Sequence, residues 1–261
     1  MTNHARLRAI APPLVVGVGG LALWELVLTV LNPKAFVLPR PSVIAGKVVE
    51  QWSTIVTATT NTGFIAVTGL IAGALLGIMV AILVSRFQIV SEAVTPLAVA
   101  VNAIPIIALA PIFNFWFGLR SPRSNQGIVV LLVFFPVFVN SVRGLTEVHR
   151  GQLDLMESFA ASTWETLKEV RIPNALPYLF TSLKIASSLA VIAAIVAEYF
   201  GGDQAALGQL IVQQAALSRY SSAWAGVLAG TLMGMALYLV VVVLERWFMP
   251  WRVTEIERSG S

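Results

Sequence analysis

The chain has 261 residues, of which 57% are hydrophobic and 11% are charged, and its mean hydropathy is +0.82. A soluble domain has about one quarter charged residues, so this composition excludes an ordinary soluble protein and favours one lipid-embedded domain over residues 1–261. The absence of cysteine excludes thiolate catalysis and cysteine-ligated metals, and the net charge of +4 comes from basic residues beside apolar runs, which favours membrane orientation over nucleic-acid binding.

Six apolar segments are candidate membrane spans, since a helix needs about 20 residues to cross the hydrocarbon. They cover residues 10–31, 62–84, 90–117, 127–142, 176–199 and 222–244, and the fourth is marginal in length. An even number of spans places both termini on one side, and the excess of Lys and Arg predicts that this side is the cytoplasm. Residues 43–52, which follow two prolines, predict an amphipathic helix at the outer interface.

The stretch of about 150–173 is unusually polar for this chain and falls on the cytoplasmic side. Asp154 is followed three residues later by Glu157, and Ser162 by Glu165, so each pair fits a capping box at a helix N-terminus. The two boxes predict two short helices.

These helices are expected to meet near Ala160 and Ala161 and to carry apolar side chains such as Phe159 and Trp164. Pro173 predicts the end of the second helix, because it lacks an amide hydrogen and restricts the residue before it. The mixed charge of the pair favours a groove on a soluble partner over simple adhesion to the bilayer. An ordinary amphipathic connector is the alternative.

The same stretch resembles the cytoplasmic EAA loop of permease subunits of bacterial ABC importers. The pattern of that loop is Glu-Ala-Ala, three residues, Gly, nine residues, Ile-x-Leu-Pro. With Pro173 on the motif proline, Ala160 stands at the glycine and residues 154–156 stand at Glu-Ala-Ala, so the acidic start and the spacing fit while the two alanines and the glycine do not. The resemblance is closest to the nitrate, sulfonate and taurine branch and extends over "LPRPSVI", "IPIIALAPIFNFWFGL" and "FTSLKIASSLAVIAAIVAEYFGG".

The resemblance implies an all-α integral membrane protein with the six transmembrane helices of the type I ABC importer permease (MetI-like) fold and a cytoplasmic coupling-helix loop. It implies a multi-pass protein of the bacterial cytoplasmic (inner) membrane that works as two permease copies, as a homodimer, with two ATPase subunits and an extracytoplasmic substrate-binding protein. Closure of the ATPases would drive alternating access. The residues that the resemblance implies for coupling are Asp154, Glu157, Phe159, Ala160, Ala161, Ser162, Trp164 and Pro173.

The sequence carries no sign of catalysis by this chain. No phosphate-binding G-x-x-x-x-G-K-[ST] motif occurs, so ATP and Mg²⁺ are expected on the partner subunit, with no cofactor on this one. The two histidines, His4 and His149, have no metal-ligand spacing, and no serine has a base at a readable distance.

Polar and proline residues inside the spans are candidates for a translocation pathway, because a charge in the hydrocarbon costs about 2.5 to 3.5 kcal/mol and broken helices need protein or water around them. Lys184 either lines the pathway, binds an anion, snorkels toward the interface or forms a structural pair, while Glu198 either gates or contacts substrate or is a solvated helix end. Glu25 is expected at an interhelical or interfacial position. The pathway candidates are Asn102, Pro105, Asn140, Lys184 and Glu198.

Two other functions remain open from the residues alone. An ATP-independent channel or secondary transporter predicts a proton relay in mid-membrane, and a non-transporting scaffold leaves the polar third span unexplained. The "AEYFGG" ending of the fifth span looks more like relatives that import riboflavin or pyrimidine-type vitamin precursors than like those for nitrate, sulfonate or taurine.

Overall fold

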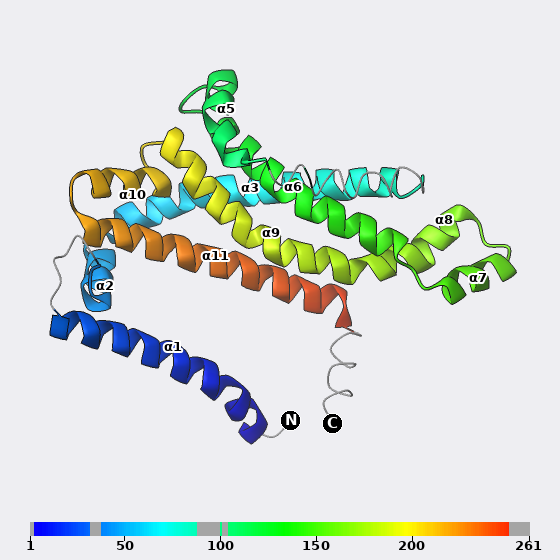
Figure 1. The fold of residues 1–261 in the computed structure, drawn as a ribbon, viewed down its shortest axis with the longest axis horizontal. Coiled ribbons are helices and arrows are strands. Elements are labelled where there is room, and N and C mark those ends of the chain that lie inside the picture. Colours follow the sequence, from blue (N-terminus) through cyan, green and yellow to red (C-terminus); the bar gives the residue numbers. More distant parts are fainter. Residues whose placement is uncertain (1–2, 32–37, 88–99, 101–103, 251–261) are drawn as a thin grey trace.

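The protein is a bundle of long helices with a helical hairpin at one end (Figure 1). The computed structural model describes residues 3–31, 38–87, 100 and 104–250, and no strand occurs in these ranges. The helices are α1 (Asn3–Leu31), α2 (Pro41–Glu50), α3 (Trp52–Val84), α5 (Ala110–Phe117), α6 (Pro122–Thr146), α7 (Arg150–Ser158), α8 (Thr163–Thr166), α9 (Ile172–Phe200), α10 (Leu207–Ala216) and α11 (Tyr220–Phe248), with a 3₁₀ turn at Ile106–Leu109 and a π turn at Leu167–Arg171.

The core of the bundle lies where α3, α6 and α9 meet. Small residues on α3 let the helix backbones approach closely, as in other membrane bundles. A Cβ atom at Gly73, for example, would lie only 2.7 Å from the carbonyl oxygen of Val130 on α6. Buried branched and small side chains fill the space between the three helices: Ile65, Ala66, Leu70, Ala74, Val129, Val133, Val137, Ala186, Ala190, Val191, Ala193 and Ala194.

Four helical stretches in the described ranges are long and apolar enough to cross a membrane, namely Trp52–Val84, Pro122–Thr146, Thr163–Phe200 and Tyr220–Phe248. Two shorter apolar helices, Val15–Leu31 and Ile106–Phe117, fall on the first and third predicted spans. The stretch at 122–146 is longer than the predicted 127–142 because Ser121 caps it and Pro122 starts it, so its polar first turn belongs to the helix.

The third predicted span is not one helix in its described part. Ile104 and Pro105 are non-helical, and Pro105 has φ −71° and ψ 79° where it precedes the 3₁₀ turn. The helix is broken at this point within the predicted span of 90–117, because Pro105 cannot donate an amide hydrogen bond and its ring disfavours a helical Ile104. Asn102 and most of the segment before it lie outside the described residues.

The prediction that Pro173 ends the second cytoplasmic helix is also wrong. The chain stays helical from α8 through the π turn into α9, and Pro173 occupies the first turn of α9. The wider π turn ends at Arg171, two residues before Pro173, and relieves the clash that the proline ring would make with the carbonyl of Glu169 four residues earlier. The hairpin is thereby joined to α9 without a loop.

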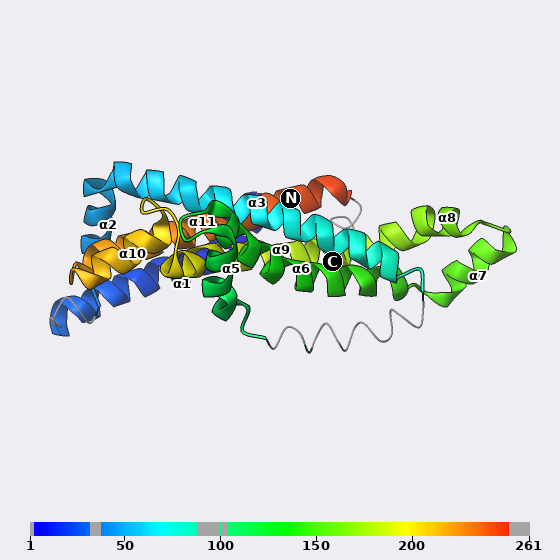
Figure 2. The same ribbon diagram turned by 90° about the horizontal axis from the view of Figure 1, so that it is seen from above.

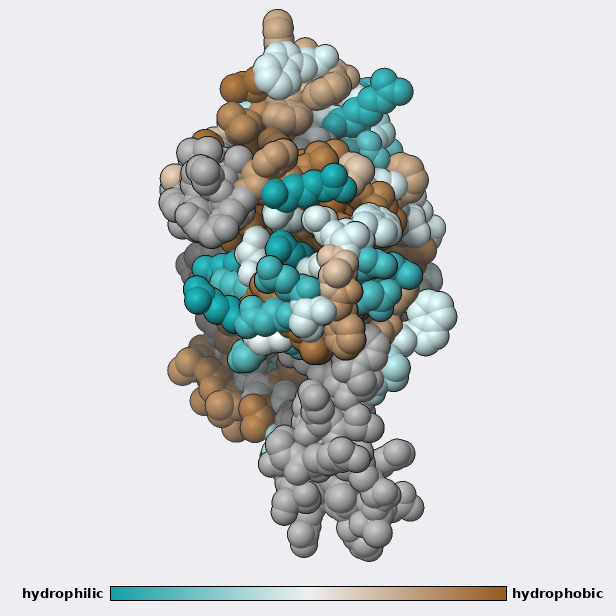
Figure 3. Space-filling model, turned by 90° about the vertical axis from the view of Figure 1, so that its right-hand side faces the viewer, coloured by the Kyte–Doolittle hydropathy of each residue, from teal (hydrophilic) through white to brown (hydrophobic). Residues whose placement is uncertain are grey.

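The two ends of the bundle differ in character. The α7–α8 hairpin projects from one end, called here the hairpin end, whereas α2 and α10 lie at the opposite end, called the far end (Figures 1 and 2). Figure 3 looks onto the hairpin end and shows hydrophilic side chains gathered there.

The amphipathic helix expected at 43–52 is α2, at the far end. The α1 helix is attached there as well, since Glu25 accepts hydrogen bonds from the backbone N–H (3.0 Å) and hydroxyl (2.7 Å) of Ser42 on α2. Glu25 is therefore interhelical, as its sequence position predicts.

Candidate functional site

The hairpin consists of two short helices joined by a tight turn at Ala160 and Ala161, where the sequence predicts it. Ala160 has a φ of 53°, a conformation that glycine adopts at no cost and that L residues seldom adopt. This is the position at which Ala160 replaces the glycine of the resembling motif. The turn closes through the N–H of Ala160, which donates to the carbonyl of Glu157 (2.9 Å), and the N–H of Ala161, which donates to Met156 (3.0 Å).

The capping box at Ser162 is present as predicted. The Ser162 hydroxyl accepts from the backbone N–H of Glu165 (3.3 Å), while the Glu165 carboxylate accepts from the backbone N–H of Ser162 (2.7 Å). Two orphan amides at the start of α8 are thereby satisfied. This cap fixes the direction in which α8 leaves the turn.

The other predicted cap is wrong, because Asp154 lies in the middle of α7. His149 caps that helix instead, with its Nδ1 accepting from the backbone N–H of Gly151 at 3.3 Å. Sequence reasoning missed it because His149 lacks the usual Ser, Thr, Asp or Asn signature of an N-cap. Asp154 and Glu157 are exposed on α7 instead, where their charges are available to a partner.

The base of the hairpin is tied to the bundle by Asn174. Its Nδ2 donates to the carbonyl of Gly144 (2.8 Å) and to the carbonyl of Glu147 (3.2 Å), which joins the start of α9 to the end of α6. A Cβ atom at Gly144 would lie 2.7 Å from Cα of Ala175, so the two helices touch backbone to backbone. Movement of the hairpin is therefore passed to α6 and α9 together.

The tip of the hairpin exposes large apolar side chains that no other described residue covers. Phe159 is 74% exposed, Trp164 is 62% exposed and Leu155 is 55% exposed. Trp164 also lines a hollow of about 270 Å³ between α8 and the end of α3, which Arg86 and Arg171 border. Exposed aromatic anchors beside charged groups are the usual composition of a protein-binding hot spot.

Within the described ranges, the polar candidate residues of the spans do not converge on one cavity. Asn140 on α6 donates to the carbonyl of Pro136 (2.8 Å), a bond within its own helix. Lys184 on α9 makes an ion pair with Glu245 on α11, with Nζ lying 2.9 and 3.0 Å from the two carboxylate oxygens. Of the alternatives open for Lys184, the structure therefore shows the structural ion pair.

Glu198 is not a solvated helix end, which corrects that reading. It is fully buried, and its Oε2 accepts from the Thr62 hydroxyl (3.0 Å) and from the backbone N–H of Gly208 (2.8 Å). Thr62 in turn accepts from the backbone N–H of Leu207 (2.8 Å). The sequence pointed to Glu198 but missed Thr62 and Gly208, because their contacts span 136 and 10 residues and leave no local signature.

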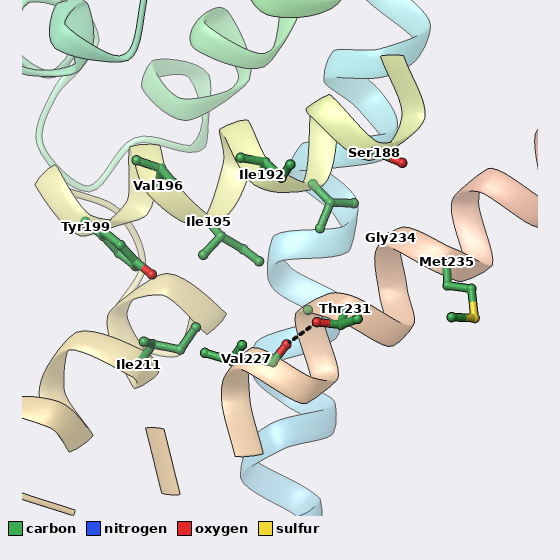
Figure 4. Close-up of a pocket in the computed structure, with 12 residues that line it drawn as sticks. Ser188, Ile192, Ile195, Val196, Tyr199, Ile211, Val227, Thr231, Gly234 and Met235 are labelled. Atoms are coloured by element: carbon green, nitrogen blue, oxygen red, sulfur yellow. Dashed lines mark hydrogen bonds between the residues drawn. The ribbon is translucent and has the colours of Figure 1, made fainter. Parts of the chain in front are cut away.

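A cavity of about 380 Å³ opens between α9, α10 and α11 (Figure 4). Its walls are mainly apolar, and hydroxyl groups come from Ser188, Tyr199 and Thr231, while Gly234 of α11 leaves space where a larger residue would project. None of its lining residues carries a charge, and none of the pathway candidates lines it. The sequence did not predict this cavity, because apolar residues that line a cavity cannot be told from apolar residues that face lipid by sequence alone.

Comparison with known proteins places the chain in a family. Residues 73–253 match the family model described as the inner membrane component of binding-protein-dependent transport systems. The chain is 32% identical to the formylaminopyrimidine transport permease protein of Halalkalibacterium halodurans, over 89% of this chain and 92% of that one. It is 31% identical to a probable ABC transporter permease of Haemophilus influenzae, over 95% and 100%.

More distant relatives are named for other substrates. The riboflavin transport system permease of Chloroflexus aurantiacus is 26% identical over 90% of this chain and 87% of that one. A solved structure of an amino acid ABC transporter with histidines shares the fold, with a TM-score of 0.61 and 15% identity over 76% of this chain and 95% of that one.

The likeness to an ABC transporter permease structure and the all-helical build of the described ranges agree with the expected type I importer (MetI-like) fold. The family works with a substrate-binding protein and an ATPase, which leaves no support for the alternative of an ATP-independent channel. The chain belongs to the binding-protein-dependent transport family and is the permease subunit of an ABC importer, a multi-pass protein of the inner membrane.

Proposed function

We propose that the α7–α8 hairpin is the surface on which the ATPase subunit binds, and that this chain hydrolyses no ATP itself. The observation that carries the proposal is the exposure of Phe159 and Trp164 at the tip of a hairpin whose base is tied to both α6 and α9. Large aromatic side chains held out in water are costly unless a partner covers them. ATP and Mg²⁺ belong to the partner in this scheme.

The working unit is two copies of this chain, two ATPase subunits and one extracytoplasmic binding protein, with both termini and the hairpin in the cytoplasm. The direct helical link from α8 into α9 supports a mechanism in which closure of the ATPases draws the hairpins together and tilts α6 and α9. The helices then open the pathway alternately to the two sides. Asp154, Glu157, Ala161 and Ser162 position or flank the aromatic tip.

The scheme is tested by reversing two exposed charges, Asp154→Lys with Glu157→Lys, in the complete transporter. Both side chains are exposed and neither caps the helix, so the permease is expected to fold while ATPase binding falls at least tenfold. Co-purification and ATP-driven uptake into proteoliposomes measure the two effects. Undiminished binding by the doubly reversed variant contradicts the assignment, and Lys47→Glu with Glu50→Lys on α2 is the control far from the hairpin.

For the substrate, we propose an uncharged heterocycle of the riboflavin or pyrimidine-precursor type. The uncharged cavity between α9, α10 and α11 supports this, since an anion such as a sulfonate or taurine needs a cation or several N–H donors once it leaves water. A planar ring suits an apolar cavity that has open space beside Gly234 and an aromatic side chain, Tyr199, in its lining. The substrates named for two relatives, formylaminopyrimidine and riboflavin, are of this class.

Filling the cavity is expected to block transport without disturbing the fold. A Cβ atom at Gly234 would meet Val191 at an ordinary 3.9 Å, so Gly234→Leu projects into free space. Uptake of radiolabelled formylaminopyrimidine or riboflavin by the reconstituted transporter is expected to fall at least tenfold, whereas Gly20→Leu on α1, where a Cβ atom meets nothing within 4 Å, leaves it unchanged. Normal uptake by the Gly234→Leu variant, or uptake of taurine in preference to both probes, rules out this substrate site.

A further inference from the structure

The far end of the bundle contains a buried cluster of polar groups. Its residues do not line the proposed substrate cavity. The far-end cluster consists of Thr62 on α3, Asn125 on α6, Glu198 on α9, and Leu207 and Gly208 at the start of α10. It therefore joins four helices at one point. Asn125 takes part through its Nδ2, which donates to the carbonyl of Gly201 at 3.0 Å.

Two oxygen atoms of the cluster are buried without a hydrogen-bond donor. They are Oε1 of Glu198 and Oδ1 of Asn125, on side chains that are 0% and 1% exposed. Both side chains border Gly202, where a Cβ atom would lie 2.8 Å from Asn125 Nδ2 and 3.5 Å from Glu198 Cγ. A buried acceptor without a donor is unfavourable, so two such oxygens in one place indicate a shared hydrogen between them.

No positive side chain neutralises Glu198 in the part of the chain that the structure describes. Its carboxyl group makes no ion pair there, and the basic residues of the neighbouring segments, Arg120 and Arg123 around the start of α6 and Arg219 before α11, are all exposed. Tyr199 and Asp203 are the titratable groups beside Glu198 in the chain segment that follows it, and the Asp203 carboxylate accepts from the N–H of Ala205. An ionised Glu198 would thus be a buried, unpaired negative charge beside a second acid, an arrangement that proteins avoid.

We infer that Glu198 is held as a neutral carboxylic acid whose Oε1–H donates to Oδ1 of Asn125. One hydrogen then serves both orphaned oxygens, while Oε2 continues to accept from Thr62 and Gly208. The proton is resident and is not transferred during transport. Glu198 is in this sense a positioning residue, because its bonds make the far ends of α3, α6, α9 and the start of α10 move as one body when the hairpin moves.

Glu198→Gln separates this state from an ionised carboxylate. The amide is neutral, accepts through Oε1 and donates through Nε2, so transport by the complete reconstituted transporter is expected to stay within about twofold of the wild type. Glu198→Ala removes every bond and is expected to lower transport at least tenfold while ATPase binding at the distant hairpin is retained. The transport readout rests on the proposed function. If the wild-type chain does not bind the ATPase subunit, that result contradicts the proposed function and leaves the protonated Glu198 carboxyl group untouched.

Infrared difference spectroscopy of the wild type against Glu198→Gln tests the protonation state even if variants transport poorly. A carboxylic acid C=O band at neutral pH that is missing in Glu198→Gln, and that shifts in Asn125→Asp, is the expected result. The inference is overturned by a carboxylate band in its place. It is equally overturned by loss of transport in a folded Glu198→Gln variant, or by dependence of wild-type stability on Na⁺ or K⁺ at constant ionic strength, which would mean that a cation fills the space.

Discussion

Replacing both Phe159 and Trp164 with alanine is expected to weaken binding of the ATPase subunit by about 100-fold or more. Aromatic anchors at the centre of an interface commonly contribute at least 2 kcal/mol each, and every 1.4 kcal/mol is a factor of ten in affinity. The side chains are 74% and 62% exposed in the permease, so their loss costs the permease itself little stability. Titration of the ATPase against immobilised permease in detergent or nanodiscs measures the effect.

The chain provides a matched control for this pair on α5. Phe115 is 87% exposed and Trp116 is 65% exposed, so the Phe115→Ala and Trp116→Ala variant removes the same apolar area from a site remote from the hairpin. Its ATPase affinity is expected to match that of the wild type. Equal loss of affinity in both double variants would show that the effect comes from general apolar surface and not from the hairpin.

The second large effect is expected at the ion pair between Lys184 and Glu245. Its charged groups are 2.9 Å apart on side chains that are 23% and 15% exposed, and they join α9 to α11. Removing one partner strands the other charge in a low-dielectric region, so Glu245→Gln is expected to lower the free energy of unfolding by about 3 kcal/mol. Thermal unfolding of the purified protein measures the loss.

Reversal of the pair distinguishes the ion pair from simple packing. Lys184→Glu together with Glu245→Lys restores opposite charges and is expected to recover most of the stability that either single change removes. Glu50→Gln, which breaks the exposed pair with Lys47 on α2, is the control and should change little. If the reversed double variant is as unstable as the sum of the single variants, electrostatic pairing is not what holds these helices together.

The fold was largely predictable, because the length of each apolar segment can be found from the local sequence alone. The long apolar runs, the amphipathic α2 and the Ser162 capping box all follow from patterns within about 20 residues. The helical passage through Pro173 was not predictable, since it depends on a π turn that no composition rule signals. The helix α10 lies between two predicted spans and was not predicted, and the bonds from its first amides to Thr62 and Glu198 leave no local sequence signal.

The site was only partly predictable from sequence. The hairpin residues could be found because the motif has fixed spacing. The partners of Lys184 and Glu198 could not, because helical periodicity shows only that the two lie too far apart to pair with each other. Their actual partners, Glu245 and Thr62, come from other helices 61 and 136 residues away.

The most direct test of the account is where the hairpin lies. The chain has no cysteine, so a single Ser158→Cys substitution gives one reactive thiol next to the hairpin tip. A membrane-impermeant maleimide is expected to label it in inverted membrane vesicles but not in right-side-out spheroplasts, and bound ATPase subunit is expected to block the labelling. Labelling from the outside, or labelling that the ATPase does not affect, would contradict the claim that the ATPase subunit binds this hairpin in the cytoplasm.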